Sequence, residues 1–164
     1  MLEFVLQDWE VNAGNPKGRL VLAFFRLCQF LRKLPGSWWL LASPILALYV
    51  VLVEWIMGIE LGYRSAVGKR LRLYHGTGLI VHPWAVIGDD VTLRHGVTIG
   101  FRKNTDKRLP VLGNRVEVGC GASILGPITI GDGARVGAGS VVMQNVPAGA
   151  TVIGNPARIV SRKS

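Results

Sequence analysis

From Gly58 onward, an aliphatic residue returns at every sixth position, and glycine often follows it directly. Half-buried strands repeat every two residues and helices every 3.6, whereas a period of six is typical of a parallel β-helix with three flat faces. The repeated side chains then point inward and stack on those of the next coils. The pairs that keep the phase are Val67-Gly68, Ile87-Gly88, Ile99-Gly100, Leu112-Gly113, Val118-Gly119, Ile130-Gly131 and Val136-Gly137. We expect a mainly β fold, a left-handed parallel β-helix of hexapeptide repeats over residues 58–164, preceded by an α-helical N-terminal segment over residues 1–57.

Two breaks interrupt this phase: a two-residue slip within residues 77–81 and a longer excursion over residues 101–111. Insertions in a solenoid project as loops from one edge, and such loops often build the binding site. The excursion carries four basic residues, Arg102, Lys103, Lys107 and Arg108. It is either a solvated charged loop or a lid over an anionic ligand.

The N-terminal segment contains two apolar runs at helical spacing, residues 20–34 and 38–53, separated by Pro35 and Gly36. The second run carries no charge, is broken by Ser43 and Pro44, and is short of the roughly 20 residues that a bilayer span needs. It either packs against other subunits of an oligomer or lies in a membrane interface. The flanking residues that suit the second alternative are Trp38, Trp39, Arg32 and Lys33.

The composition fits a folded, glycine-punctuated protein, with 49% hydrophobic residues, 18% charged residues and 21 glycines. A formal net charge of +9 predicts an anionic partner. Because the basic residues are spread over several segments, a phosphorylated ligand or a membrane surface is favoured over nucleic acid. Cys28 and Cys120 lie in unrelated segments and predict neither a disulfide nor a metal site. The first ten residues lack the basic start of an export signal, so we expect a cytoplasmic protein, free or at the inner face of the membrane.

Three histidines are the candidates for proton transfer, because the sequence shows no nucleophile motif. One coil of a three-sided β-helix takes roughly 18 residues, so the repeats at Leu73, Leu93, Val118 and Val136 stack once both breaks are counted. The residues two places after these form one row, spaced about 4.8 Å along the stack: His75, His95, Cys120 and Ala138. This arrangement places the reactive histidines and a long bound ligand along one groove. The alternative is that both histidines are solvated and have no catalytic role. His82, beside a proline, is interpreted as a corner residue.

Three segments carry a resemblance to a known family: Tyr74-His75-Gly76-Thr77-Gly78-Leu79-Ile80-Val81, Gly96-Val97-Thr98-Ile99-Gly100, and Gly137-Ala138-Gly139-Ser140-Val141-Val142 with Gly154-Asn155-Pro156-Ala157-Arg158-Ile159-Val160. Residues 58–160 resemble the serine acetyltransferase group of hexapeptide-repeat transferases, most closely its colanic-acid-type, exopolysaccharide branch. The resemblance implies an acetyl-CoA-dependent O-acetyltransferase that acts as a homotrimer and needs no metal.

The resemblance also implies roles for single residues. His75 matches the general base of the family, and Glu60 stands fifteen residues upstream, where a carboxylate orients that histidine. The positions of Cys120 and Ala138 match those whose backbone amides line the coenzyme A groove. Arg158 is the leading candidate for the phosphates of coenzyme A.

The departures from the family concern the acceptor. Serine-specific members carry an aspartate where this chain has Tyr74, and a second active-site histidine where it has Leu109, while Arg108 is kept. A zwitterionic amino acid needs partners for both of its charges, so the loss of the carboxylate argues against serine. We expect the hydroxyl of a sugar or exopolysaccharide precursor as acceptor, with His95, Tyr74 and Arg108 around it.

Three alternatives remain open at this point. One is a serine acetyltransferase with altered pocket residues, and another is a scaffold without catalytic activity. The third is a metal-dependent hydratase of the carbonic anhydrase type, which shares the fold and takes zinc ligands from the histidines of adjacent subunits. The three histidines here do not have that family's spacing, so we expect no metal.

Overall fold

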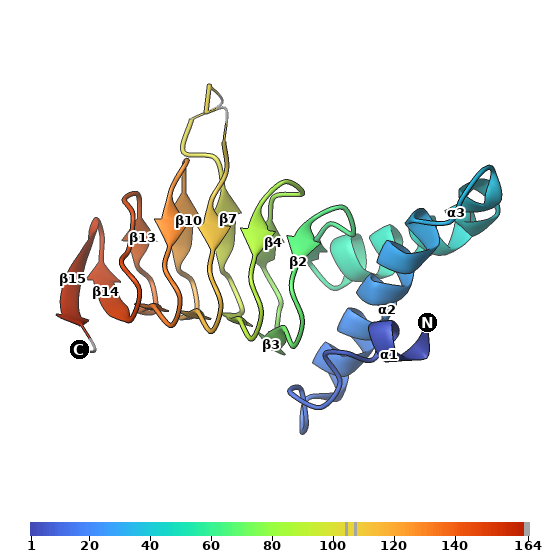
Figure 1. The fold of residues 1–164 in the computed structure, drawn as a ribbon, viewed down its shortest axis with the longest axis horizontal. Coiled ribbons are helices and arrows are strands. Elements are labelled where there is room, and N and C mark those ends of the chain that lie inside the picture. The colour runs from blue at the N-terminus through green and yellow to red at the C-terminus, as the bar shows by residue number, and fades with distance from the viewer. Residues whose placement is uncertain (104, 107, 163–164) are drawn as a thin grey trace.

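The computed structural model describes residues 1–103, 105, 106 and 108–162 as a column of parallel strands with helices at one end (Figure 1). The strands form three sheets, and each coil adds a strand to each sheet. The first sheet holds β1 (Ile59–Leu61), β4 (Leu79–Val81), β7 (Thr98–Gly100), β10 (Ser123–Leu125) and β13 (Val141–Val142). The second holds β2 (Ala66–Val67), β5 (Val86–Ile87), β8 (Val111–Leu112) and β11 (Thr129–Ile130). The third holds β3 (Arg72–Tyr74), β6 (Thr92–Arg94), β9 (Glu117–Val118), β12 (Arg135–Val136), β14 (Ala150–Gly154) and the antiparallel β15 (Ala157–Arg162).

The period of six builds the core, because each repeated aliphatic side chain points into the column. In register, Leu73 pairs with Leu93, Val81 with Ile99, and Ile87 with Leu112. All six side chains are at most 2% exposed. Fully burying such a side chain contributes about 1.5–3 kcal/mol. The expected mainly β fold, a parallel β-helix behind an N-terminal helical segment, is confirmed.

The helical segment consists of α1 (Leu2–Val5), α2 (Pro16–Arg32), α3 (Trp38–Tyr49) and the π-helix η1 (Val50–Ile56), which continues α3. The predicted start of the first long helix at residue 20 is wrong: Asn15 caps α2 by accepting from Gly18 N–H, and proline occupies its first turn.

The expected interruption at Pro44 does not end α3. Proline has no N–H to donate to the carbonyl of Leu40, four residues earlier, and the Ser43 hydroxyl donates to that carbonyl instead, at 2.7 Å. Among the described residues, no helix has the length and apolar character needed to cross a bilayer.

The N-terminal segment terminates the open end of the column, where the first coil has no coil beneath it. Side chains of Asp8, Asn12 and Asn15 take the place of a neighbouring strand beside β3. Asp8 accepts from Leu71 N–H at 2.8 Å, and Asn12 accepts from Leu73 N–H at 2.9 Å. The amide groups of Asn12 and Asn15 donate to the carbonyls of the same two leucines.

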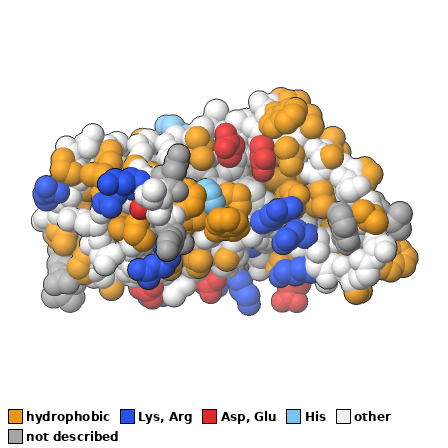
Figure 2. All heavy atoms as spheres, turned by 90° about the horizontal axis from the view of Figure 1, so that it is seen from above, with side chains coloured by type: hydrophobic (Ala, Val, Ile, Leu, Met, Phe, Trp, Pro, Cys, Tyr) orange, Lys and Arg blue, Asp and Glu red, His pale blue; other side chains and the backbone are white. Residues whose placement is uncertain are grey.

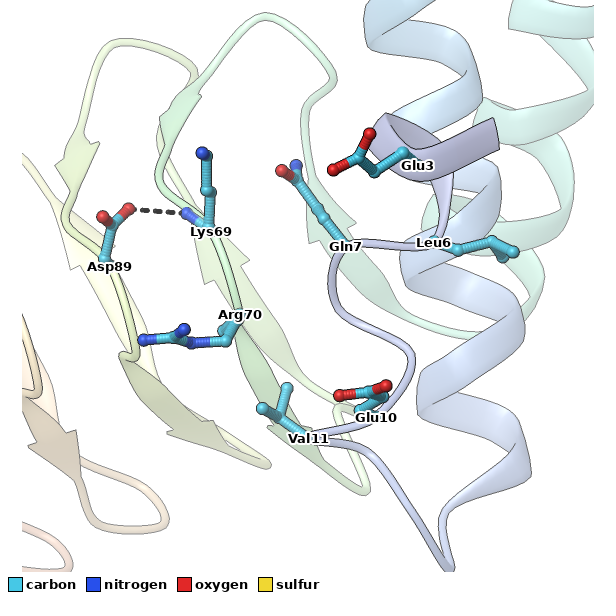
Figure 3. A pocket seen from close by; sticks show the side chains of 8 residues that line it. All are labelled: Glu3, Leu6, Gln7, Glu10, Val11, Lys69, Arg70 and Asp89. Carbon is cyan, nitrogen blue, oxygen red and sulfur yellow. Dashed lines mark hydrogen bonds between the residues drawn. The ribbon is translucent and has the colours of Figure 1, made fainter. Parts of the chain in front are cut away.

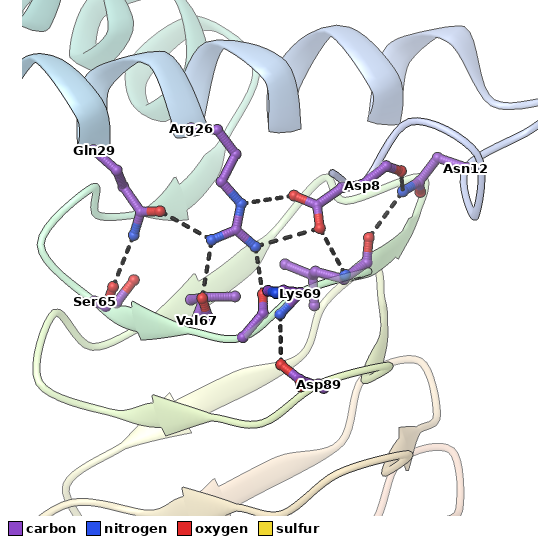
Figure 4. A network of polar contacts seen from close by, with 10 residues as sticks. Asp8, Asn12, Arg26, Gln29, Ser65, Val67, Lys69 and Asp89 are labelled. Carbon is purple, nitrogen blue, oxygen red and sulfur yellow. Dashed lines mark hydrogen bonds and ion pairs between the residues drawn. The ribbon is translucent and has the colours of Figure 1, made fainter. Parts of the chain in front are cut away.

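Arg26 closes the edge of β2 (Figure 4). Its guanidinium donates to the carbonyl of Val67 at 2.9 Å and to that of the following glycine, and it pairs with Asp8 at 2.7 Å. Both charged side chains are buried, at 1% and 2% exposure. The Tyr49 hydroxyl, from α3, donates to the carbonyl of Leu61 on β1 at 2.7 Å. Strands of all three sheets thus end on side-chain hydrogen bonds, which blocks pairing with a further strand.

Candidate active site

The predicted row lies at the corner where the third sheet leads into the first. His95, Cys120 and Ala138 occupy the same place in consecutive coils. Gly121 N–H donates to His95 C=O at 3.0 Å, and Gly139 N–H donates to Cys120 C=O at 2.8 Å. These bonds place the three residues one above another along the column.

His75 reaches this corner from a bulge. Seven positions separate Leu73 from Ile80, whereas five separate their partners Leu93 and Thr98. The coil of His75 therefore holds two additional residues at the corner.

The bulge corrects the predicted position of the slip. His75 and Gly76 both have positive φ, at 64° and 72°. Thr77 C=O accepts from Gly96 N–H at 3.0 Å, so Thr77 continues the backbone row below His95. The slip lies at residues 74–78 rather than 77–81, and His75 stands outside the regular backbone row. Left-handed backbone is costly for a residue with a Cβ, and such positions cluster at functional sites.

The rings of His75 and His95 nevertheless meet. Their centroids lie 5.9 Å apart with an angle of 66° between the ring planes. Both side chains are exposed. Two imidazoles from adjacent coils thus share one open surface, where a proton acceptor is accessible to a substrate.

Glu60 lies on β1, in the first sheet, one coil below. Ile59 Cδ1 is 3.0 Å from where a Cβ on Gly76 would be, so the bulge rests on the start of β1. The Glu60 side chain is exposed. Among the hydrogen bonds of the described residues, none joins Glu60 to His75, and its orienting role stays a prediction.

A second carboxylate, Glu54, lies close to Glu60 and was not found from the sequence. Burial raises the pKa of Glu54, and the negative charge of Glu60 adds to this rise. Its position at the end of the apolar run is the signal in the sequence. A charged residue at this position lies where the helix ends against the first coil.

Tyr74 and Arg94 form a pair beside the two histidines. They are register partners on β3 and β6, and the Arg94 guanidinium lies 4.9 Å from the centre of the Tyr74 ring. A cation over an aromatic face is attracted by the ring quadrupole. Arg94 is therefore a further residue at this corner that sequence reasoning missed.

The row continues through small residues above the histidines. A Cβ on Gly119 would lie 2.4 Å from the backbone nitrogen of Ala138, so the two coils approach too closely there for any side chain. Cys120 is half-buried and Ala138 is exposed. This stretch of corner is shaped mainly by backbone, as the approach of a long ligand requires.

Arg158 lies on β15, at the far end of the third sheet. Its side chain is exposed and donates to Ala157 C=O at 3.0 Å. It lines a shallow hollow of about 280 Å³ together with Met143, Gln144 and Pro156. A positive charge is thus available several coils above the histidines.

The long loop leaves a different corner, between β7 of the first sheet and β8 of the second, and projects from the column (Figure 1). His82 stands at its base, with ring centroids 4.6 Å from Phe101 and 5.5 Å from Trp84. Arg108 is exposed on this loop, and Lys107 lies outside the described residues. Because the first sheet separates the two corners, one chain does not bring Arg108 to His75.

A hollow of about 470 Å³ lies elsewhere, between the N-terminal segment and the first coils (Figure 3). It mixes charges of both signs, among them Glu3, Glu10, Lys69 and Asp89, and contains no histidine or cysteine. Lys and Arg side chains form separate groups along the face seen in Figure 2 rather than one tract. Within the described residues, no group of three or more His, Cys, Asp or Glu is placed to hold a metal ion.

Comparisons with known sequences agree on one family. The family described as "Bacterial transferase hexapeptide (six repeats)" matches residues 110–144. WcaB of Escherichia coli (strain K12), named as an acetyltransferase of colanic acid biosynthesis, is 37% identical over 160 residues, which cover 94% of this chain and 98% of WcaB. A serine acetyltransferase of Helicobacter pylori is 38% identical over 169 residues, covering 98% and 95%.

Comparisons with solved structures give serine acetyltransferases. The enzyme from Brucella abortus strain S19, in complex with coenzyme A, has a TM-score of 0.81 and 29% identity, covering 99% of this chain and 68% of that chain. The soybean enzyme complexed with serine has a TM-score of 0.75 and 38% identity, covering 89% and 58%. This chain spans 57% of the serine O-acetyltransferase from Brucella melitensis, which it matches with a TM-score of 0.75 and 33% identity.

Proposed function

Because the chain belongs to the hexapeptide-repeat transferase family and is an acetyltransferase, we propose that it moves the acetyl group of acetyl-CoA to a hydroxyl of a sugar or exopolysaccharide precursor. The observation that carries the proposal is the corner where His75 and His95 meet, with Tyr74 and Arg94 beside them. The similarity to WcaB supports a sugar acceptor.

The reaction is a direct transfer. His75 takes the proton of the acceptor hydroxyl while its oxygen attacks the thioester carbonyl of acetyl-CoA. The tetrahedral intermediate collapses, the carbon–sulfur bond breaks, and the imidazolium returns the proton to the leaving thiolate. The products are the acetyl ester and free coenzyme A, and no covalent enzyme intermediate forms. Glu60 orients the ring and stabilises the imidazolium.

Coenzyme A lies along the corner above the histidines. Backbone amides near Cys120 and Ala138 bind its pantetheine arm, because the small side chains leave the backbone accessible. Arg158, at the far end, meets its phosphates. The solved complex of a similar serine acetyltransferase with coenzyme A supports this co-substrate.

The acceptor lies at the histidine end of the row. His95 and Tyr74 contact the sugar, with Arg94 holding the Tyr74 ring from above. Serine is disfavoured because Tyr74 replaces the carboxylate that would meet its ammonium group. A flat ring beside two imidazoles suits the hydroxyl-bearing face of a sugar better.

The active form of the enzyme is a homotrimer. The histidine corner is exposed on one chain, whereas acetyl transfer needs a site that excludes water. Arg108 and the projecting loop leave a different corner of the column. Side-by-side packing places the loop of one subunit over the histidine corner of its neighbour, and Arg108 then reaches the acceptor.

The second candidate function is a serine O-acetyltransferase, which the similarity to the Helicobacter pylori enzyme and the Brucella and soybean structures favours. Purified enzyme with acetyl-CoA is given either L-serine or a panel of free and nucleotide-linked sugars, and the product is identified by mass spectrometry. An acetylated sugar without O-acetylserine supports the proposal. O-acetylserine formed at the faster rate replaces it with the second candidate.

The cellular location of the enzyme is a further part of the proposal. Acetyl-CoA is a cytoplasmic co-substrate, so the enzyme acts in the cytoplasm, in solution or at the inner face of the membrane. Fractionation of cells followed by immunodetection tests this location.

A further inference from the structure

The helical run of α3 and η1 has an apolar side that no described part of the chain covers. Among the described side chains of this run, Ala42, Leu46, Tyr49 and Val53 are buried against the protein, at 0–8% exposure. The opposite side carries large apolar side chains at helical spacing: Leu40, Ile45, Leu48, Val51, Leu52, Trp55 and Ile56. We call these seven residues the apolar stripe. Its most exposed members are Trp55 at 77% and Ile56 at 70%, and Trp38 at the start of α3 is 64% exposed.

Charge is missing from this surface. Residues 34–53 contain no Asp, Glu, Lys or Arg. The single acidic residue between Trp38 and Ile56 is Glu54, which is half-buried. Contiguous apolar surface of this kind marks an interaction site, since covering it removes apolar area from water.

Positive charge lies just before the start of α3 in the chain. Arg32 and Lys33 end α2, and a turn of a few residues joins them to Trp38. They line a hollow of about 300 Å³ together with Arg64, from the turn between β1 and β2. All three side chains are exposed, and none of them takes part in the ion pairs found among the described residues. The hollow therefore offers a place for an anionic group.

We propose that α3 and η1 bind in the interfacial layer of an anionic bilayer, with the apolar stripe among the acyl chains and Arg32, Lys33 and Arg64 at lipid phosphates. Trp38, at the start of the run and outside the stripe, suits the headgroup level. No described helix is long enough to cross, so the run lies on the membrane surface rather than spanning it. The proposal does not depend on the acceptor of the enzyme.

A second copy of the chain is a poorer occupant of the stripe. A second stripe, which itself carries no charge, supplies no anionic partner for Arg32, Lys33 and Arg64, whereas an anionic membrane does. The stripe also lies at the helical end of the column, away from the sides along which columns pack (Figure 1). In a side-by-side trimer of parallel columns, the three copies of the stripe lie at the same end of the assembly, and a membrane surface can bind more than one of them.

The test is co-sedimentation of the full chain with vesicles of phosphatidylcholine alone or of equal parts phosphatidylcholine and phosphatidylglycerol. Wild type binds the anionic vesicles and binds the neutral ones more weakly. Trp55→Glu lowers binding to the anionic vesicles by at least roughly tenfold, since a charge enters the acyl region. Trp84→Glu is the matched control, because Trp84 is 74% exposed on the solenoid and lies outside the stripe, and it binds like wild type.

A second variant tests the headgroup contacts. The triple change Arg32→Gln, Lys33→Gln and Arg64→Gln lowers affinity for anionic vesicles by roughly fivefold for each residue and abolishes the preference over neutral vesicles. Circular dichroism of each variant verifies that it is folded. Absence of wild-type binding to both vesicle types overturns the proposal. So does a fall in the sedimenting mass of Trp55→Glu without vesicles, which assigns the stripe to a second copy.

Discussion

The imidazole rings of His75 and His95 lie 5.9 Å apart, although twenty positions separate them in the sequence. One coil of the column brings them together, and the two-residue bulge moves His75 off the regular corner. Their environments differ as a result. The bulge that carries His75 rests on the start of β1, the strand of Glu60, whereas His95 stacks in the regular row below Cys120.

The first prediction separates the two histidines. His75→Ala lowers kcat by roughly 10²–10⁴, because it removes the proposed general base, while acetyl-CoA still binds. His95→Ala mainly raises the KM for the acceptor, since a neighbour contacts the sugar without taking its proton. Steady-state kinetics and calorimetric titration of acetyl-CoA measure both effects. Loss of turnover in His95→Ala with near-normal turnover in His75→Ala reverses the assignment.

Glu60→Gln provides the intermediate case in the same assay. It keeps the shape of the side chain and removes the charge that supports the imidazolium, so kcat falls less than in His75→Ala. Full activity in Glu60→Gln assigns the orienting role to another group, and Glu54→Gln is then the variant to test.

The solenoid and the row were predictable because the period of six acts on every coil. Leu73 and Leu93 repeat the same inward position, so counting residues places His95, Cys120 and Ala138 above one another. Counting residues gave the size of the bulge at His75 but not its position. An insertion shifts the phase by the same amount wherever it lies, so the hydrogen bond from Gly96 N–H to Thr77 C=O and the left-handed backbone at His75 and Gly76 are needed to locate it.

Other features depend on contacts that no local pattern records. Asp8 and Arg26 lie eighteen positions apart, in segments whose sequences indicate a polar stretch and an apolar helix. Together they nevertheless close a strand edge. The Arg94 position beside Tyr74 follows from strand register, which becomes visible only after the coils are aligned. Arg108 was grouped with the histidines by resemblance, and the fold of one chain places it at another corner.

The second prediction uses the two cysteines. Cys28 is fully buried, and burial raises the pKa of its thiol to about 12, so iodoacetamide does not modify it in the folded protein. Cys120 is half-buried in the proposed coenzyme groove. Mass spectrometry shows modification at Cys120 alone, and saturating acetyl-CoA slows it. Labelling of Cys120 at the same rate with and without acetyl-CoA contradicts the groove, and Cys120→Ala controls for the site of modification.

The third prediction concerns pH. Burial raises the pKa of Glu54 in the folded protein, so the folded state holds a proton more strongly than the unfolded state. The free energy of unfolding therefore falls as pH rises through the window between the ordinary carboxyl pKa and the raised one. Glu54→Gln is more stable than wild type at pH 7, and the difference vanishes at acidic pH. Urea titrations across this range measure it, with Glu3→Gln on the exposed first helix as control; a Gln variant less stable at every pH refutes the explanation.

The last prediction concerns the buried pair that closes the column. Arg26→Met leaves the Asp8 carboxylate buried without its cation and removes the donors to the β2 carbonyls, so the free energy of unfolding falls by about 3–5 kcal/mol. Arg135→Gln is the matched control. Its partner Glu117 lies 3.7 Å away in an exposed ion pair, and such pairs contribute little in water. Urea unfolding at one fixed protein concentration compares the two variants, because dissociation of an oligomer would otherwise add to the signal. The double variant Asp8→Asn with Arg26→Met recovers part of the loss, since no uncompensated charge then stays buried. Equal stability losses in Arg26→Met and Arg135→Gln would show that the N-terminal segment is not what holds the first coil closed.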